Sequence, residues 1–171
     1  MFIFIRSNGA PAITILALAV LISCGTKDAE HTAPPATWAP GISQNLTRSG
    51  ATTQCVIDNI GQVGNPAVER LVQVPGATTF GITGWAIDEP NKTTAGGVDV
   101  VIDQAPYNAH YGSPRPDVAT HFKQPNYANS GFELMVAPGQ LAKGPHSVSI
   151  RIISSDKKSY YQGPVVPFAV N

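Results

Sequence analysis

The sequence has few charged residues and no excess of either sign. Asp, Glu, Lys and Arg make up 13% of the chain, and 11 basic residues balance 11 acidic ones. This balance excludes the basic field that nucleic-acid binding needs and the acidic field that concentrates cations. Because 43% of the residues are hydrophobic and no long run of charge occurs, the composition also excludes disorder of the whole chain. We therefore expect a folded protein that does not bind nucleic acid.

Long apolar segments are equally scarce. The main apolar run, from Ala10 to Ile22, is shorter than the roughly 20 residues that a membrane-spanning helix needs. Arg6 precedes it, and together they have the form of the positive region and the hydrophobic region of a secretory signal peptide. The sequence therefore predicts export.

The apolar run ends in Leu21-Ile22-Ser23-Cys24, which resembles the lipobox of bacterial lipoproteins. The resemblance implies a signal peptide over 1–23, cleavage after Ser23, diacylglycerol on Cys24 and acylation of the new amine. Several acyl chains hold a protein at a membrane durably, whereas one chain holds it only marginally. Gly25 rather than Asp follows the cysteine, which by enterobacterial sorting rules implies the outer membrane. We expect a cell-envelope protein whose membrane partner is reached through Cys24.

Cysteine is rare, with only two in the chain. If Cys24 carries lipid, Cys55 has no partner, and the mature protein has no internal disulfide even in an oxidising compartment. Cys55 lies in the strand-like run Thr53-Gln54-Cys55-Val56-Ile57. We interpret it as a small buried hydrophobic residue rather than a reactive thiol.

Residues 24–52 show no lasting period of 2 or 3.6 and are rich in Pro, Thr and Ala. This composition predicts a flexible tether after the lipidated cysteine, extended around its prolines. Trp38 is its one large residue. The sequence leaves open whether Trp38 touches the membrane interface, docks on the following domain or does neither.

Residues 53–171 alternate apolar and polar positions in short runs separated by Gly and Pro. The chain has 16 glycines and 15 prolines, and no amphipathic segment of helical length interrupts the runs. Period-2 alternation predicts half-buried strands, and six or seven of them with turns between indicate an all-β, antiparallel β-sandwich. We expect Trp85 to be its central aromatic residue. The clearest runs are Phe80–Ile87, Val98–Asp103, Phe132–Val136, Val148–Ile152 and Val166–Val170.

An insert near 105–130 departs from this alternation. Pro114 and Pro116 favour extended conformations in the residues before them. Asp117 is then positioned to cap a short helix near 117–122, and Pro125 to end it.

Several motifs of this domain resemble a bacterial immunoglobulin-like module that occurs in exported proteins and at the C-termini of some membrane glycosyltransferase-like proteins. The resemblance covers roughly residues 54–170 and implies an immunoglobulin-like sandwich. It implies no catalytic residues and no glycosyltransferase activity, because the 171 residues contain no multi-span catalytic part. The motifs are Gly84–Asp88, Val98–Asp103, Tyr111-Gly112 with Arg115–Ala119, Ser130–Phe132 and Gly144–Val148.

The insert supplies the candidate binding residues Tyr111, Arg115 and Asp117, with His121 and Tyr127 nearby. Aromatic faces and Arg or Asp edges suit sugars, which indicates a patch for an envelope glycan or protein. The alternative is structural: Asp117 caps the helix and Arg115 pairs locally or packs on tyrosine. Both interpretations stay open on the sequence alone.

The sequence gives little support for a metal site, a catalytic nucleophile or a phosphate-binding loop. The acidic residues lack the spacing of a calcium loop, and the histidines lie on separate predicted elements without the paired spacing of a zinc site. No G-x-S-x-G nucleophile motif is present, and Gly61–Gly64 lacks the ending of a phosphate loop. We expect no metal, no cofactor and no catalytic residues. The residues weighed were Asp88, Glu89, Asp99 and Asp103 for calcium, and His110, His121 and His146 for zinc.

These inferences predict a non-enzymatic, lipid-anchored envelope protein that presents an immunoglobulin-like binding or structural module. The alternative is an accessory protein or a cryptic enzyme of envelope carbohydrate metabolism, with the strand face of Asp99 and Asp103 as its site.

Overall fold

The computed structural model describes residues 37–69 and 72–171. The predicted signal peptide, Cys24 and the first part of the predicted tether lie outside the described residues. The strands are β1 (Thr47–Arg48), β2 (Cys55–Ile60), β3 (Val63–Gly64), β4 (Gln73–Val74), β5 (Phe80–Asp88), β6 (Thr93–Thr94), β7 (Gly97–Ile102), β8 (Ala105–Asn108), β9 (His110–Ser113), β10 (Gly131–Val136), β11 (Gly144–Ile153), β12 (Ser159–Gln162) and β13 (Val166–Val170). The helical elements are η1 (Ile42–Asn45), α1 (Pro116–His121) and η2 (Pro125–Tyr127).

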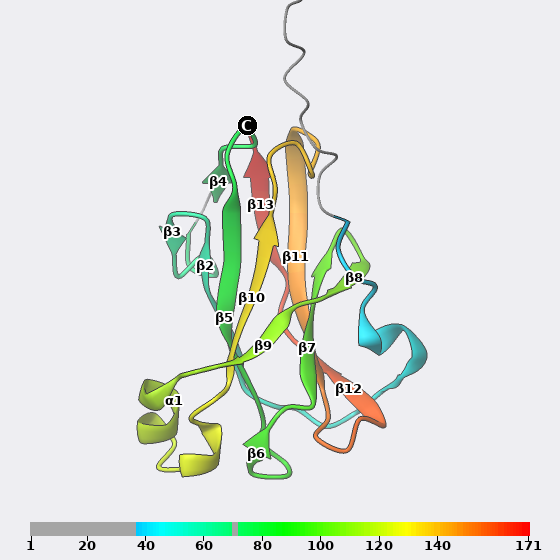
Figure 1. Cartoon of the computed structure of the whole chain (residues 1–171), viewed down its shortest axis with the longest axis vertical. Helices are drawn as coiled ribbons and strands as arrows, with labels where there is room; N and C mark the ends of the chain where they lie inside the picture. The colour runs from blue at the N-terminus through cyan, green and yellow to red at the C-terminus, as the bar shows by residue number, and fades with distance from the viewer. Residues whose placement is uncertain (1–36, 70–71) are drawn as a thin grey trace, which may run out of the picture. The chain divides into compact units, whose positions relative to one another are not determined.

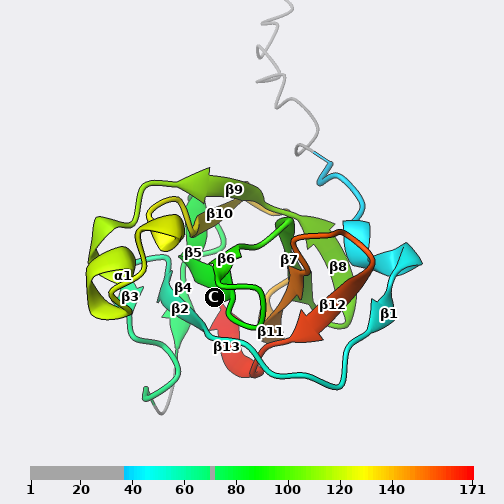
Figure 2. The ribbon, with the colours of Figure 1, turned by 90° about the horizontal axis from the view of Figure 1, so that it is seen from below.

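The strands form two sheets that pack face to face (Figure 1), which confirms the all-β sandwich prediction. In the seven-stranded sheet, here the β11 sheet, β11 pairs with β7 along one edge and with β12 and β13 along the other. In the six-stranded sheet, here the β5 sheet, β5 lies between β2 and β10. Figure 2 shows α1 and β1 at opposite sides of the domain: α1 lies outside the β5 sheet, and β1 is the edge strand of the β11 sheet beside β12.

The pairing departs from a purely antiparallel sandwich at two short edge strands. β1 pairs in parallel with β12, and β4 pairs in parallel with β13. Each is two residues long. These two short strands lie at the ends of the strand order β1-β12-β11-β13-β4, while the long central strands are antiparallel as predicted.

The main core fills the space between the sheets with the apolar positions of the alternating runs. Because side chains alternate across a strand, every second residue faces this core. Val98, Val100 and Ile102 of β7 and their counterparts on β5, β10, β11 and β13 are buried there. Burying each such side chain contributes about 1.5–3 kcal/mol, so these runs account for the stability of a sandwich without a disulfide.

Trp85 is not the central aromatic residue of this core, which corrects the prediction. Phe80, Ile82 and Ala86 of the same strand face the main core, so Trp85 at an alternate position faces the outer side of the β5 sheet. There it joins a second cluster below the insert. Within the described residues, the buried aromatic residues of the main core are Phe80, Phe132, Tyr161 and Phe168.

The described part of the predicted tether is ordered against the sandwich, which corrects the boundary at residue 52. The ring of Trp38 packs 4.5 Å from that of Tyr107, and its Nε1–H donates to the carbonyl of Met135 at 2.8 Å. Tyr107 belongs to the β11 sheet and Met135 to the β5 sheet, so Trp38 contacts both layers. Of the roles left open for Trp38, docking on the domain is the one observed.

Asp99 holds the next part of this segment. Its carboxylate is fully buried and accepts the backbone N–H groups of Ile42 at 3.0 Å and Ser43 at 2.6 Å. Gly41 passes so close that a Cβ there would lie 2.7 Å from the Asp99 carboxylate. Composition alone predicted a linker because these partners lie more than 50 residues away in the sequence. We call residues 37–49 the N-terminal strap.

The insert contains the expected short helix, but its start differs from the prediction. α1 begins at Pro116 after Arg115, and no side chain caps it. Proline suits the first helical position because its φ is already helical and its missing N–H would have no partner there. Asp117 lies inside the first turn and binds Arg115 instead. Across the two described ranges, no helix is long and apolar enough to cross a membrane.

Candidate functional site

Arg115 clamps the insert to the β5 sheet. Its Nη1 lies 2.6 Å from Asp58 Oδ2, and its Nε and Nη2 donate to the two oxygens of Asp117 at 2.9 and 2.6 Å. Asp58 reaches this position because the β2–β5 register shifts between Ile57 and Asn59, and the extra residue of such a bulge re-aims a side chain. The hydrogen bonds from Arg115 hold the pKa of Asp117 at about 2. Arg115 therefore pairs locally, as the structural alternative proposed from the sequence described.

Tyr111 does not join Arg115 and Asp117. Its hydroxyl donates to the carbonyl of Ala86 at 2.7 Å and accepts the N–H of Ala95 at 2.9 Å. Burial raises the pKa of this phenol to about 12. Tyr111 therefore links β9 to two backbone groups of the sandwich through its hydroxyl.

The insert instead places a different aromatic group beside Asp117. Phe122 meets Trp85 edge-on at 5.6 Å and Tyr127 at 5.7 Å, and Tyr127 is buried beneath them. Beside this cluster lies a hollow of about 360 Å³ lined by Trp85, Asp117, Val118, His121 and Phe122. We call it the insert hollow. The sequence pointed to its neighbourhood through Asp117 and His121 but assigned Trp85 to the core.

The acidic residues weighed as a calcium site have separate structural partners. Buried Asp88 accepts the Tyr161 hydroxyl at 3.0 Å, the Ser155 N–H at 2.7 Å and the Asn91 side chain at 2.8 Å. Burial by itself raises the pKa of Asp88, but these donors outweigh it and the net shift is downward. Asp99 binds the N-terminal strap, as described above. Asp103 belongs to a third arrangement, described next.

Asp103 pairs with His146. The Nδ1 atom of His146 lies 2.6 Å from Asp103 Oδ2, and Nε2 lies 2.8 Å from the carbonyl of Ala142. Burial lowers the pKa of the ring, but the two acceptors outweigh it and the net pKa is raised. His110 on β9 and His121 on α1 are exposed and lie in different elements. Within the part of the chain that the structure describes, no three His, Cys, Asp or Glu residues gather as a metal site.

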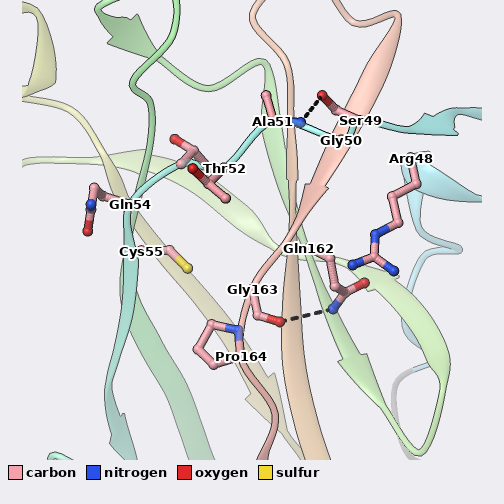
Figure 3. A pocket seen from close by; sticks show the side chains of 11 residues that line it. Arg48, Ser49, Gly50, Ala51, Thr52, Gln54, Cys55, Gln162, Gly163 and Pro164 are labelled. Carbon is pink, nitrogen blue, oxygen red and sulfur yellow. Dashed lines mark hydrogen bonds between the residues drawn. The ribbon is translucent and has the colours of Figure 1, made fainter.

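One further hollow was missed from the sequence. It measures about 560 Å³ and is lined by residues 48–55 and 162–164, where the chain leaves β1 in the β11 sheet and enters β2 in the β5 sheet. Figure 3 shows Arg48 and Gln162 on one side and Cys55 on the other. We call it the crossing hollow. Sequence analysis placed residues 48–52 in the tether, and only the Ser, Gly and Thr content of 49–53 hinted at exposed polar backbone.

Cys55 lies at the inner side of the crossing hollow. It packs against the main core and is the free cysteine of the described chain. Burial raises the pKa of its thiol to about 11. A thiol with that pKa is almost entirely protonated near neutral pH and is a poor nucleophile, in line with the interpretation of Cys55 as a structural residue.

No protein-family model matches the chain, and no curated protein matches it.

Proposed function

We propose that this chain is a lipid-anchored protein of the bacterial cell envelope that presents a preformed glycan-binding surface and catalyses no reaction. The predicted anchor is Cys24, with the outer membrane as its location. The immunoglobulin-like module is the proposed carrier of the surface, and an envelope glycan is its proposed partner.

The insert hollow is the observation that carries this proposal. Ligand sites combine apolar and aromatic walls with a few fixed polar groups. Trp85 and Phe122 provide the aromatic wall, and Asp117 and His121 provide polar groups at its edge. Because the pKa of Asp117 is about 2, its carboxylate stays ionised at physiological pH and accepts hydrogen bonds from sugar hydroxyls.

Rigidity supports the same proposal. Arg115 ties the first turn of α1 to β2 through Asp58, and buried Tyr127 anchors η2. A site whose residues are already held in place loses less conformational entropy when it binds. The wall of the insert hollow is therefore in place before a glycan arrives.

The alternative, a cryptic carbohydrate-active enzyme, gains no support from the acidic strand face. Asp99 is buried under the N-terminal strap, and Asp103 binds His146. Both carboxylates thus already have partners, whereas glycosidases need two carboxyl groups that face each other across the substrate.

A glycan array probed with the full-length lipoprotein in detergent micelles tests the proposal. We expect retention of a subset of envelope glycans, and roughly five-fold weaker binding by His121→Ala, which removes one hydrogen-bonding group from the insert hollow. His110→Ala is the matched control, because His110 is exposed on β9 outside the hollow. Equal losses in both variants would remove the insert hollow as the site, and turnover of any retained glycan would refute the non-enzymatic assignment.

A further inference from the structure

We infer that the crossing hollow is a second binding site, and that it takes a small carboxylate-bearing, hydroxyl-rich molecule such as a uronic acid. This inference goes beyond the proposed function, because none of the residues lining the insert hollow lines the crossing hollow. Its volume of about 560 Å³ lies within the usual range of small-molecule sites, roughly 300–1,000 Å³.

The charge of the crossing hollow favours an anion. Arg48 is the single charged side chain among the lining residues, and no carboxylate accompanies it. The guanidinium of Arg115 is neutralised by two aspartates, and that of Arg151 lies over the Tyr160 ring. Arg48, by contrast, has no ion pair within residues 37–69 and 72–171. A planar guanidinium with no partner of its own matches a carboxylate through two parallel hydrogen bonds.

One cation selects a carboxylate over a phosphate monoester. A phosphate monoester carries about 1.5 to 2 negative charges at neutral pH, and sites for it usually gather several donors or cations. A carboxylate carries one charge, which Arg48 alone balances. The count of charges in the lining therefore sets the class of anion.

Polar groups beside Arg48 can form hydrogen bonds with the hydroxyl groups of a ligand. The amide of Gln162 is held by its Nε2, which donates to Ser149 Oγ and to the Gly163 carbonyl, both at 3.2 Å. These bonds leave Oε1 as an acceptor. The backbone N–H groups of Gly50 and Thr52 make no hydrogen bond within the described chain. Acceptors and donors together around a cation suit a polyhydroxylated acid better than a simple fatty acid.

The walls of the crossing hollow are fixed before any molecule binds. The N–H of Ser49 donates to the Tyr160 carbonyl at 2.8 Å, which ties the start of the crossing to β12. The Thr53 hydroxyl donates to the Ile87 carbonyl at 2.5 Å, which ties its end to β5. At Gly163 a Cβ would lie 2.8 Å from the Ile150 side chain and 3.1 Å from the Cys55 sulfur, so glycine permits the close approach of the two sheets here.

The test titrates glucuronate into the full-length lipoprotein in detergent micelles, followed by calorimetry and by ¹⁵N–¹H spectra. We expect saturable binding with shifts at the amides of Thr52, Cys55 and Gly163, and no such shifts with glucose. Arg48→Gln should weaken glucuronate binding at least ten-fold, the loss expected for a charge-assisted hydrogen-bond pair, while Arg48→Lys should retain part of it.

Two controls separate this inference from its rivals. Lys143→Gln removes an exposed cation outside the crossing hollow and should leave glucuronate binding unchanged. His121→Ala should also leave it unchanged, so failure of the glycan proposal and failure of this one are distinguishable. No glucuronate binding, equal binding of glucose, tighter binding of inorganic phosphate, or unchanged binding by an Arg48→Gln variant with a native spectrum would each overturn the inference.

Discussion

At the scale of single residues, several polar side chains of this domain form hydrogen bonds that connect distant segments of the chain. Asp88, Asp99 and Tyr111 are buried or half-buried, and each binds backbone groups from distant parts of the chain. A buried polar group is stable only when its hydrogen bonds are made, and each such bond contributes about 0.5–1.5 kcal/mol, or more when one partner is charged. These residues therefore add to the stability of the described domain, in which Cys55 is free.

The His146–Asp103 pair gives stability a pH dependence. The folded pKa of His146 is raised above its usual 6.5, so its contribution is complete below that pH and is lost as pH rises through the folded pKa. The folded pKa of Asp103 is lowered below 3.8, so its contribution is present above that pH and is lost as pH falls. Between these limits the pair is charged on both sides and stabilises the β7–β8 turn.

We therefore predict that His146→Gln lowers the free energy of unfolding more at pH 5 than at pH 8. Half of the Asp103 side chain is exposed, and solvent screening keeps the difference between the two pH values below about 1 kcal/mol. Urea unfolding at both pH values measures it, with His110→Gln as the control for an exposed histidine on β9. The same loss at pH 5 and pH 8 would show that the pair does not control the pH dependence.

At the scale of elements, the N-terminal strap and the insert cover the outer faces of the two sheets. Every residue of β7 is buried, although its alternate positions face away from the main core. η1 covers that outer face of the β11 sheet through Asp99, as α1 covers Trp85 on the β5 sheet. A charged residue takes part in holding each covering element, Asp99 for the strap and Arg115 for the insert.

We predict that Asp99→Asn releases the N-terminal strap. The substituted amide places an NH₂ donor where a carboxylate oxygen accepted a backbone N–H, so at least one buried hydrogen bond is lost. The free energy of unfolding should fall by about 1–3 kcal/mol, and amide hydrogen exchange should increase at 38–46. Glu133→Gln, at an exposed position of β10, is the control. Unchanged exchange at 38–46 in Asp99→Asn would show that the other contacts of the strap, such as those of Trp38 and β1, hold it without this carboxylate.

At the scale of the whole molecule, the predicted anchor determines whether Cys55 has a disulfide partner, and the sandwich determines how long the tether is. A lipidated Cys24 leaves Cys55 unpaired, and Cys55 lies free in the sandwich, packed against its main core. The domain is then stabilised by the packing of the apolar side chains between its sheets and by the side-chain hydrogen bonds described above. Since residues 38–49 pack on the sandwich, the tether proposed here is shorter than the composition indicated and ends near Trp38.

We predict that Cys24→Ser moves the protein out of the membrane. Without the acyl chains, the mature protein loses its proposed anchor, so the variant with its signal peptide removed should shift to the aqueous phase of a phase-separating detergent. Cys55→Ser is the matched control and should stay in the detergent phase. Detergent partitioning of Cys24→Ser equal to that of the unmodified sequence would refute the lipoprotein assignment.

The sequence by itself determined the class of fold, because strand alternation is a local property with a period of two residues. The apolar positions of β5, β7, β10, β11 and β13 could be read in this way, and the prolines at 114, 116 and 125 indicated a short helix near 117–122. The faces were harder to assign. Trp85 was placed in the main core on its size, whereas its position in the alternation with Phe80 and Ile82 already pointed it outward.

Only the tertiary structure decided which distant residues meet. Arg115 binds Asp58 across 57 positions, and Asp99 binds Ser43 across 56. The crossing hollow likewise joins residues 48–55 to 162–164. No local sequence pattern identifies such partners, because each contact depends on the order of the strands in the two sheets. The contact of Arg115 with Asp58 also depends on the bulge in β2. For that reason composition could identify residues 37–52 only as a linker, while the folded chain makes them the strap and one wall of a hollow.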